Sequence, residues 1–98
     1  MDIQEFRSTI GDELPPAGTS LSLQALWHQA KGNWDRAHEM AQKDKSKDGD
    51  WIHAHLHRVE GDDGNAGYWY RRADKPFSTL TLEEEWEEIT LELLARSR

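Results

Sequence analysis

The 98-residue sequence predicts an all-α fold: a single small domain of two helical hairpins and a C-terminal helix that caps them. Three observations predict it. Apolar residues recur at offsets of three, four and seven in several segments, which is the period of an α-helix. Gly-Asn and Gly-Asp turns join these segments in pairs. The pattern of one hairpin also recurs 29 residues later, as a repeated unit would.

The first element is an N-terminal segment, residues 1–19. A short helix over residues 2–10 would place Ile3, Phe6 and Ile10 on one side. Because so short a helix is not stable alone, we expect the segment either to dock on the rest of the chain or to be disordered.

The first hairpin is predicted over residues 20–43. Its first helix carries an apolar stripe that includes Leu23 and Trp27. Gly32 suits the left-handed position after a helix, and Asn33 suits the cap of the next one. The charged stretch that follows, residues 43–50, resembles the start of a calcium loop but has a histidine where the loop needs its last glutamate. We interpret it as a connector.

The second hairpin is predicted over residues 51–73. Gly61 and Asp62 repeat the junction of the first hairpin. Pro76 prevents the second hairpin from continuing as one helix.

The C-terminal helix is predicted over residues 81–96 because Thr81 and Glu84 have the spacing of a capping box. Its apolar stripe contains Leu82, Trp86, Ile89 and Leu93. We interpret its acidic residues, with docking to a basic partner as the alternative, as a solvated face: Glu83, Glu84, Glu85, Glu87 and Glu88.

Each of the five main helices carries one tryptophan. Aromatic side chains bury large areas, so we interpret these residues as one core anchor per helix rather than as an aromatic binding cage. They are Trp27, Trp34, Trp51, Trp69 and Trp86.

The residues Lys31 to Ala37, and Glu60 to Ala73 with Ala66 and Tyr70, resemble tetratricopeptide-type repeats. The resemblance implies packed helical hairpins that bind another protein. The longer string from Trp51 to Ala73 is also similar to a family of short, uncharacterised bacterial proteins. With two units present, we expect the C-terminal helix to cover the apolar face that a third unit would cover.

Composition excludes several classes of function. The sequence has no cysteine, which excludes disulfides, thiolate metal sites and cysteine nucleophiles. Its net charge is −7, and residues 81–98 carry six acids against two bases, so a nucleic-acid partner is not expected. No apolar run is long enough for a membrane span, and the acidic N-terminus does not resemble a signal peptide. We therefore expect a cytoplasmic protein.

The third main helix carries the cluster of side chains that is the strongest candidate for a binding or catalytic site. His53 and His57 are four residues apart and share a helical face, with Glu60 three residues beyond. Two imidazoles and a carboxylate form a candidate site for zinc or another divalent metal, with His28 or His38 assisting. Structural, hydrogen-bonded histidines are the leading interpretation; acid–base catalysis is a further alternative.

Two predictions for the orientation of this helix disagree. Apolar periodicity directs Ile52 and Leu56 to the core and leaves His53 and His57 towards solvent or a cleft. The resemblance to tetratricopeptide repeats implies instead that an open face carries Trp51, His55 and Arg58. We favour the periodicity.

Arginines near the second junction are candidates for anion binding or, as the commoner outcome, for ion pairs with Glu60, Asp62 and Asp63. They are Arg58, Arg71 and Arg72.

The sequence thus predicts a non-catalytic protein-interaction module, with no cofactor expected. The candidate residues of its partner-binding face are His53, His57, Arg58, Glu60, His28 and His38. The alternative is a metal- or ligand-binding protein, with or without enzymatic activity, centred on His53, His57 and Glu60. Self-association into a homodimer through the last helix is compatible with both.

Overall fold

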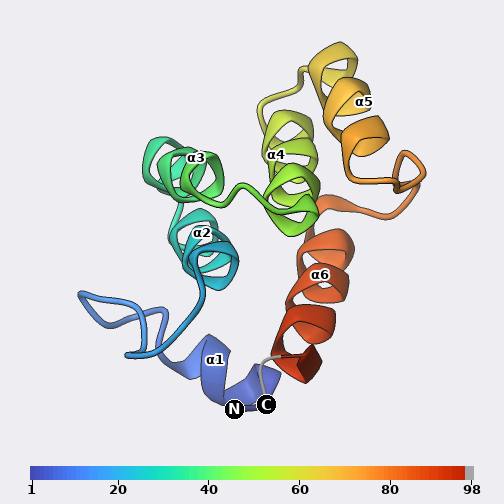
Figure 1. The fold of residues 1–98 in the computed structure, drawn as a ribbon. Coiled ribbons are helices and arrows are strands. Elements are labelled where there is room, and N and C mark those ends of the chain that lie inside the picture. Colours follow the sequence, from blue (N-terminus) through green and yellow to red (C-terminus); the bar gives the residue numbers. More distant parts are fainter. Residues whose placement is uncertain (97–98) are drawn as a thin grey trace.

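Six α-helices make up the fold in the computed structural model, which describes residues 1–96, and this part of the chain contains no strand (Figure 1). The all-α prediction is confirmed. The helices are α1 (Ile3–Ser8), α2 (Leu21–Ala30), α3 (Trp34–Lys43), α4 (Lys47–Val59), α5 (Asp63–Arg72) and α6 (Leu82–Arg96). Helices α2 and α3 form the first hairpin, and α4 and α5 form the second.

The two hairpin junctions have the same structure. Gly32 and Gly61 adopt positive φ angles of 84° and 86°, a conformation that glycine reaches without a steric cost. Asn33 and Asp62 then cap the next helix, and each side chain accepts a hydrogen bond of 3.1 Å from the backbone N–H three residues later. The sequence predicted both junctions from these residue types.

Helix α4 begins at Lys47, four residues before the predicted start at Trp51. Its first turn includes Gly49, which looked like a connector residue. A Cβ atom at Gly49 would lie 2.2 Å from the carbonyl oxygen of Asp44. The glycine is therefore required because the incoming chain crosses the helix closely, not because the segment is a loop.

The acids of this stretch do not converge on one point, so the structure does not support a calcium loop. Asp44 accepts hydrogen bonds from Ser22 and Ser46. Asp48 and Asp50 belong to α4 and form ion pairs with arginines of two other helices, Arg96 and Arg72.

Helix α1 docks on the rest of the protein, which is the first of the two outcomes expected for the N-terminal segment. Asp2 and Glu5 form a capping box at its start. Phe6 is fully buried, with its ring centroid 6.2 Å from that of Trp86 in α6. Figure 1 shows α1 beside the last turns of α6.

Helix α6 covers both hairpins. Its capping box forms as predicted: Thr81 N–H donates to Glu84 Oε1 at 3.0 Å, and Glu84 N–H donates to Thr81 Oγ1 at 3.1 Å. It packs against α2 and α4, the first helix of each hairpin, and not at the end of the second hairpin where a third repeat would follow (Figure 1). Trp86 anchors it by donating from Nε1 to the carbonyl oxygen of Leu26 at 2.8 Å.

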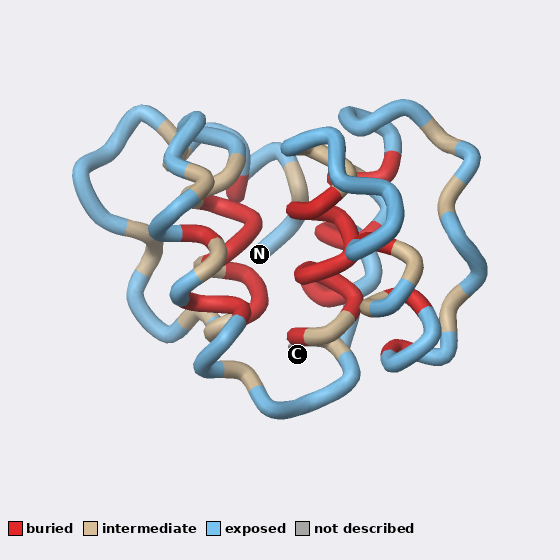
Figure 2. The backbone as a smooth tube through the Cα atoms, turned by 90° about the horizontal axis from the view of Figure 1, so that it is seen from above, coloured by how far each residue is buried: buried red, intermediate tan, exposed pale blue. Residues whose placement is uncertain are grey.

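The core lies between α2, α4 and α6, and the helices turn their buried sides inward (Figure 2). Trp27, Trp51 and Trp86 are buried there, as predicted. Trp34 and Trp69 differ: they are half-buried at its edge. Within residues 1–96, no helix has the length and apolar character needed to cross a lipid bilayer.

Candidate metal centre

Helix α4 is the central element of the site because other helices cover it on opposite sides. It packs against α3 and α5 and also against α2 and α6, and every residue from 51 to 57 is buried. Both predicted orientations are therefore wrong in one respect. His53 and His57 do not face solvent, and the face with Trp51, His55 and Arg58 is not open.

Three histidines from the two hairpins meet beside α4. His38 comes from α3, and His53 and His57 come from successive turns of α4. Each offers one ring nitrogen, and these three nitrogens lie within 4.8 Å of one another. His53 and His57 are buried and His38 is half-buried. We call this group the histidine cluster.

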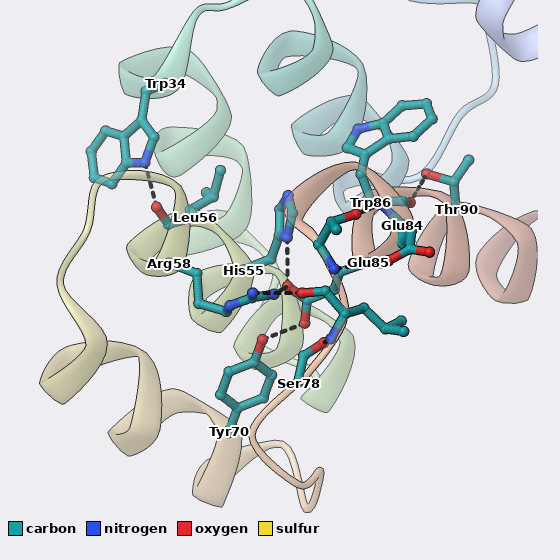
Figure 3. Close-up of polar contacts among 12 residues, drawn as sticks. Trp34, His55, Leu56, Arg58, Tyr70, Ser78, Glu84, Glu85, Trp86 and Thr90 are labelled. Atoms are coloured by element: carbon teal, nitrogen blue, oxygen red, sulfur yellow. Dashed lines mark hydrogen bonds and ion pairs between the residues drawn. The ribbon is translucent and has the colours of Figure 1, made fainter.

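The two half-buried tryptophans flank the histidine cluster. The Trp34 ring stacks on His38 with centroids 4.8 Å apart, and Trp69 stacks on His53 with centroids 4.0 Å apart. Trp34 is fixed in place because its Nε1 donates to the carbonyl oxygen of Leu56 at 2.7 Å (Figure 3). Both indoles therefore limit the access of water to the imidazoles.

The proton position on His57 follows from its partner. His57 Nδ1 lies 2.6 Å from Glu60 Oε1. An ionised carboxylate only accepts hydrogen bonds, so Nδ1 carries the proton. In the neutral ring, Nε2 then holds a free lone pair, as a metal ligand requires.

Burial favours the neutral form of two members of the cluster, His53 and His38. Burial lowers the pKa of His53 to about 4, and the charges of His38, His57, Arg72 and Lys45 act in the same direction. Burial also lowers the pKa of His38, with His57 adding to the effect. His53 Nδ1 has no hydrogen-bond partner among the described residues. Its hydrogen-bonding capacity is thus unused.

His28 does not join the histidine cluster. It lies on α2, where its ring meets that of Trp27 edge to face with centroids 5.0 Å apart. Burial and the charges of Arg36 and Lys31 lower its pKa. Of the two alternatives for an assisting histidine, the structure brings His38 and not His28 to the cluster.

The opposite side of α4 carries a buried network that the sequence did not predict. Glu85 of α6 is fully buried instead of solvated. Its carboxylate accepts from His55 Nδ1 at 2.7 Å, from Arg58 at 2.8 Å and from the hydroxyl of Tyr70 (Figure 3). Arg58 also donates to the carbonyl oxygen of Leu80 at 2.7 Å. Arg58 therefore pairs with Glu85 and not with the predicted acids near the second junction.

A signal for Glu85 was present in the sequence. The residue lies three positions after Leu82 and four before Ile89, and is therefore on the apolar stripe of α6 itself. Burial alone would raise the pKa of Glu85, but the hydrogen bonds from His55, Tyr70 and Arg58 outweigh it and hold the pKa below its usual value. The network fixes α6 to α4 and α5.

Comparisons with known proteins give no relative from which a function could be transferred. No protein-family model, no curated protein and no solved structure matches the chain. The resemblances to tetratricopeptide repeats and to short bacterial proteins stay predictions.

Proposed function

We propose that the protein binds a divalent transition-metal ion, zinc first among them, through His38, His53 and His57. The observation that carries the proposal is the approach of three imidazole nitrogens, from two hairpins, to within 4.8 Å of one another. Imidazole is a preferred ligand of zinc, copper and nickel. Three protein ligands leave a fourth position for water or another molecule.

The distances suit a site that closes on its ion. Nitrogens around tetrahedral zinc lie about 2.0–2.1 Å from the metal, and thus about 3.4 Å from one another. Binding would draw the three nitrogens together by up to about 1.4 Å from their present limit of 4.8 Å. His38 is the half-buried member and lies on the other hairpin, so the adjustment falls mainly on its side chain.

Glu60 supports the site from outside. A ligating histidine usually donates its second ring N–H to a carboxylate, which fixes the ring and increases its basicity. The 2.6 Å contact between His57 Nδ1 and Glu60 Oε1 has this arrangement. Glu60 was predicted as a direct ligand; the contact favours an orienting role in the buried centre.

The alternative of a protein-interaction module has less support from the contacts. The face implied by the repeat resemblance contains Trp51, His55 and Arg58, and the first two are buried while Arg58 is engaged by Glu85. The metal centre is therefore the function that we propose.

Calorimetric zinc titration of the untagged protein tests the proposal. We expect one tight equivalent in the wild type, and a loss of affinity of about 100-fold or more in His38→Ala because one ligand is gone. His38 is half-buried, so its truncation leaves the core intact, which circular dichroism checks.

His28→Ala is the matched control because His28 is another half-buried histidine, outside the cluster. It should bind like the wild type. Equal binding by His38→Ala, or no binding by the wild type up to millimolar zinc, would refute the proposal.

A further inference from the structure

We infer that a second metal station, made of His57, Glu60 and Asp62, captures the ion before it reaches the histidine cluster. Each of these residues offers one ligand atom, and the three atoms lie within 4.8 Å of one another. Glu60 and Asp62 are exposed, whereas His57 is buried. This capture station extends from solvent to a ligand of the buried centre, and the inference rests on the proposed metal function.

The ligands of the two groups suit successive roles. The capture station has two carboxylates and one imidazole, whereas the histidine cluster has three imidazoles. Two negative charges at the surface attract a hydrated cation, and neutral imidazoles do not. The nitrogen-rich group then holds a transition metal more selectively. His57 belongs to both groups, and its Nδ1 lies 2.6 Å from Glu60 Oε1, so the two groups are adjacent.

The first hairpin shows that the turn itself does not need these acids. With the 29-residue offset, Lys31 and Asn33 occupy the positions of Glu60 and Asp62. Asn33 caps its helix at the same 3.1 Å as Asp62 does. The two junctions have equivalent backbone geometry with different charges, so the turn does not require the negative charges of Glu60 and Asp62.

The backbone holds the capture station in position. Asp62 N–H donates to the carbonyl oxygen of His57 at 2.8 Å, and Gly61 N–H donates to that of Arg58 at 3.0 Å. These bonds fix Asp62 next to the last turn of α4. The carboxylate of Glu60 lies on the same turn, against His57 Nδ1.

Stopped-flow mixing with zinc, read by tryptophan fluorescence, tests the inference. In Asp62→Asn the cap is kept, as Asn33 keeps it in the first hairpin, but a carboxylate ligand is lost. We expect zinc association to slow by about ten-fold, because the incoming ion loses one of the two carboxylate ligands of the capture station as well as its charge. Dissociation should slow equally, so the dissociation constant stays within about two-fold of the wild type.

Asp63→Asn is the matched control, since it removes the same charge one residue away and outside the capture station. Its association rate should stay within about two-fold of the wild type, because Asp63 is not among the residues whose ligand atoms converge at the capture station. A second measurement uses His38→Ala: a weak residual zinc site should remain, and adding Asp62→Asn should remove it.

Each other outcome overturns the inference. Equal slowing by Asp62→Asn and Asp63→Asn would indicate general electrostatic attraction only. An unchanged rate in Asp62→Asn, with one tight zinc still bound, would refute the capture station and leave the metal centre standing. Failure of the wild type to bind zinc would instead refute the metal centre. The calorimetric titration of the wild type and His38→Ala tests that centre separately from the association rates.

Discussion

Glu85 joins α6 to the second hairpin through three hydrogen bonds. Its buried carboxylate accepts hydrogen bonds from three side chains of α4 and α5: His55, Arg58 and Tyr70. Burial and the bond to Glu85 raise the pKa of Tyr70, so its hydroxyl stays protonated and can donate. Removing one charge from such a buried pair leaves the other uncompensated.

Glu85→Gln should therefore destabilise the protein by about 3–5 kcal/mol at pH 7, because the Arg58 guanidinium loses its charged partner. The pKa of Glu85 is lowered in the folded state, so its stabilising contribution is present above the ordinary carboxyl range. This contribution is lost as the pH falls through the lower, folded-state pKa. The difference between wild type and variant should shrink below about pH 4.

Urea unfolding followed by tryptophan fluorescence between pH 7 and pH 3 measures this difference. Glu83→Gln, in the same turn of α6 but exposed, is the control and should change stability by less than about 0.5 kcal/mol. A Glu85→Gln variant as stable as the wild type, or a difference that grows in acid, would contradict the role of the network.

For single residues, the sequence indicated which side chains were candidates for a site better than it indicated their burial and their partners. His38 was named as a candidate ligand and lies in the cluster, because α3 and α4 are neighbours. Glu85 was misjudged because it is one of five similar acids, and only its position on the apolar stripe distinguishes it. The partner of Arg58 is 27 residues away, and no local pattern indicates such a contact.

Among the elements, the hairpin junctions were the most predictable because local chemistry determines them. Gly61 has a φ of 86°, and a side chain there would strain the backbone even though nothing lies within 4 Å of the added Cβ. The start of α4 was not predictable in the same way. Gly49 and its charged neighbours resemble a linker. Only the close approach of the Asp44 carbonyl oxygen to Gly49 shows why a glycine is needed inside the helix.

Gly61→Ala should destabilise the protein by about 1–2 kcal/mol, the cost of a non-glycine residue in the left-handed region. Gly64→Ala, three residues later inside α5, should stabilise it by up to about 1 kcal/mol because helical alanine loses less entropy. Its nearest contact would be Asp62 Oδ1 at 3.9 Å, which is ordinary packing. Chemical denaturation measures the free energy of unfolding of both variants. Equal changes in the two variants would contradict the assigned junction geometry.

For the whole molecule, the histidine cluster and the Glu85 network lie on opposite sides of one buried helix. The cluster joins α3 to α4 and thereby the first hairpin to the second, while α6 joins both hairpins from the other side. A bound ion would therefore connect the two hairpins directly. The sequence predicted the hairpins and a covering helix, but not which faces were covered, since α4 is buried almost all round and shows no single apolar stripe.

Nitrogen NMR of the histidine rings, with and without one equivalent of zinc, is the most direct measurement of the central claim. All five histidines report in one spectrum. We expect the resonances of the ring nitrogens of His38, His53 and His57 to shift, while His28 and His55 keep theirs. No shift, or shifts that include His28 and spare His38, would show that these three residues do not form a metal centre.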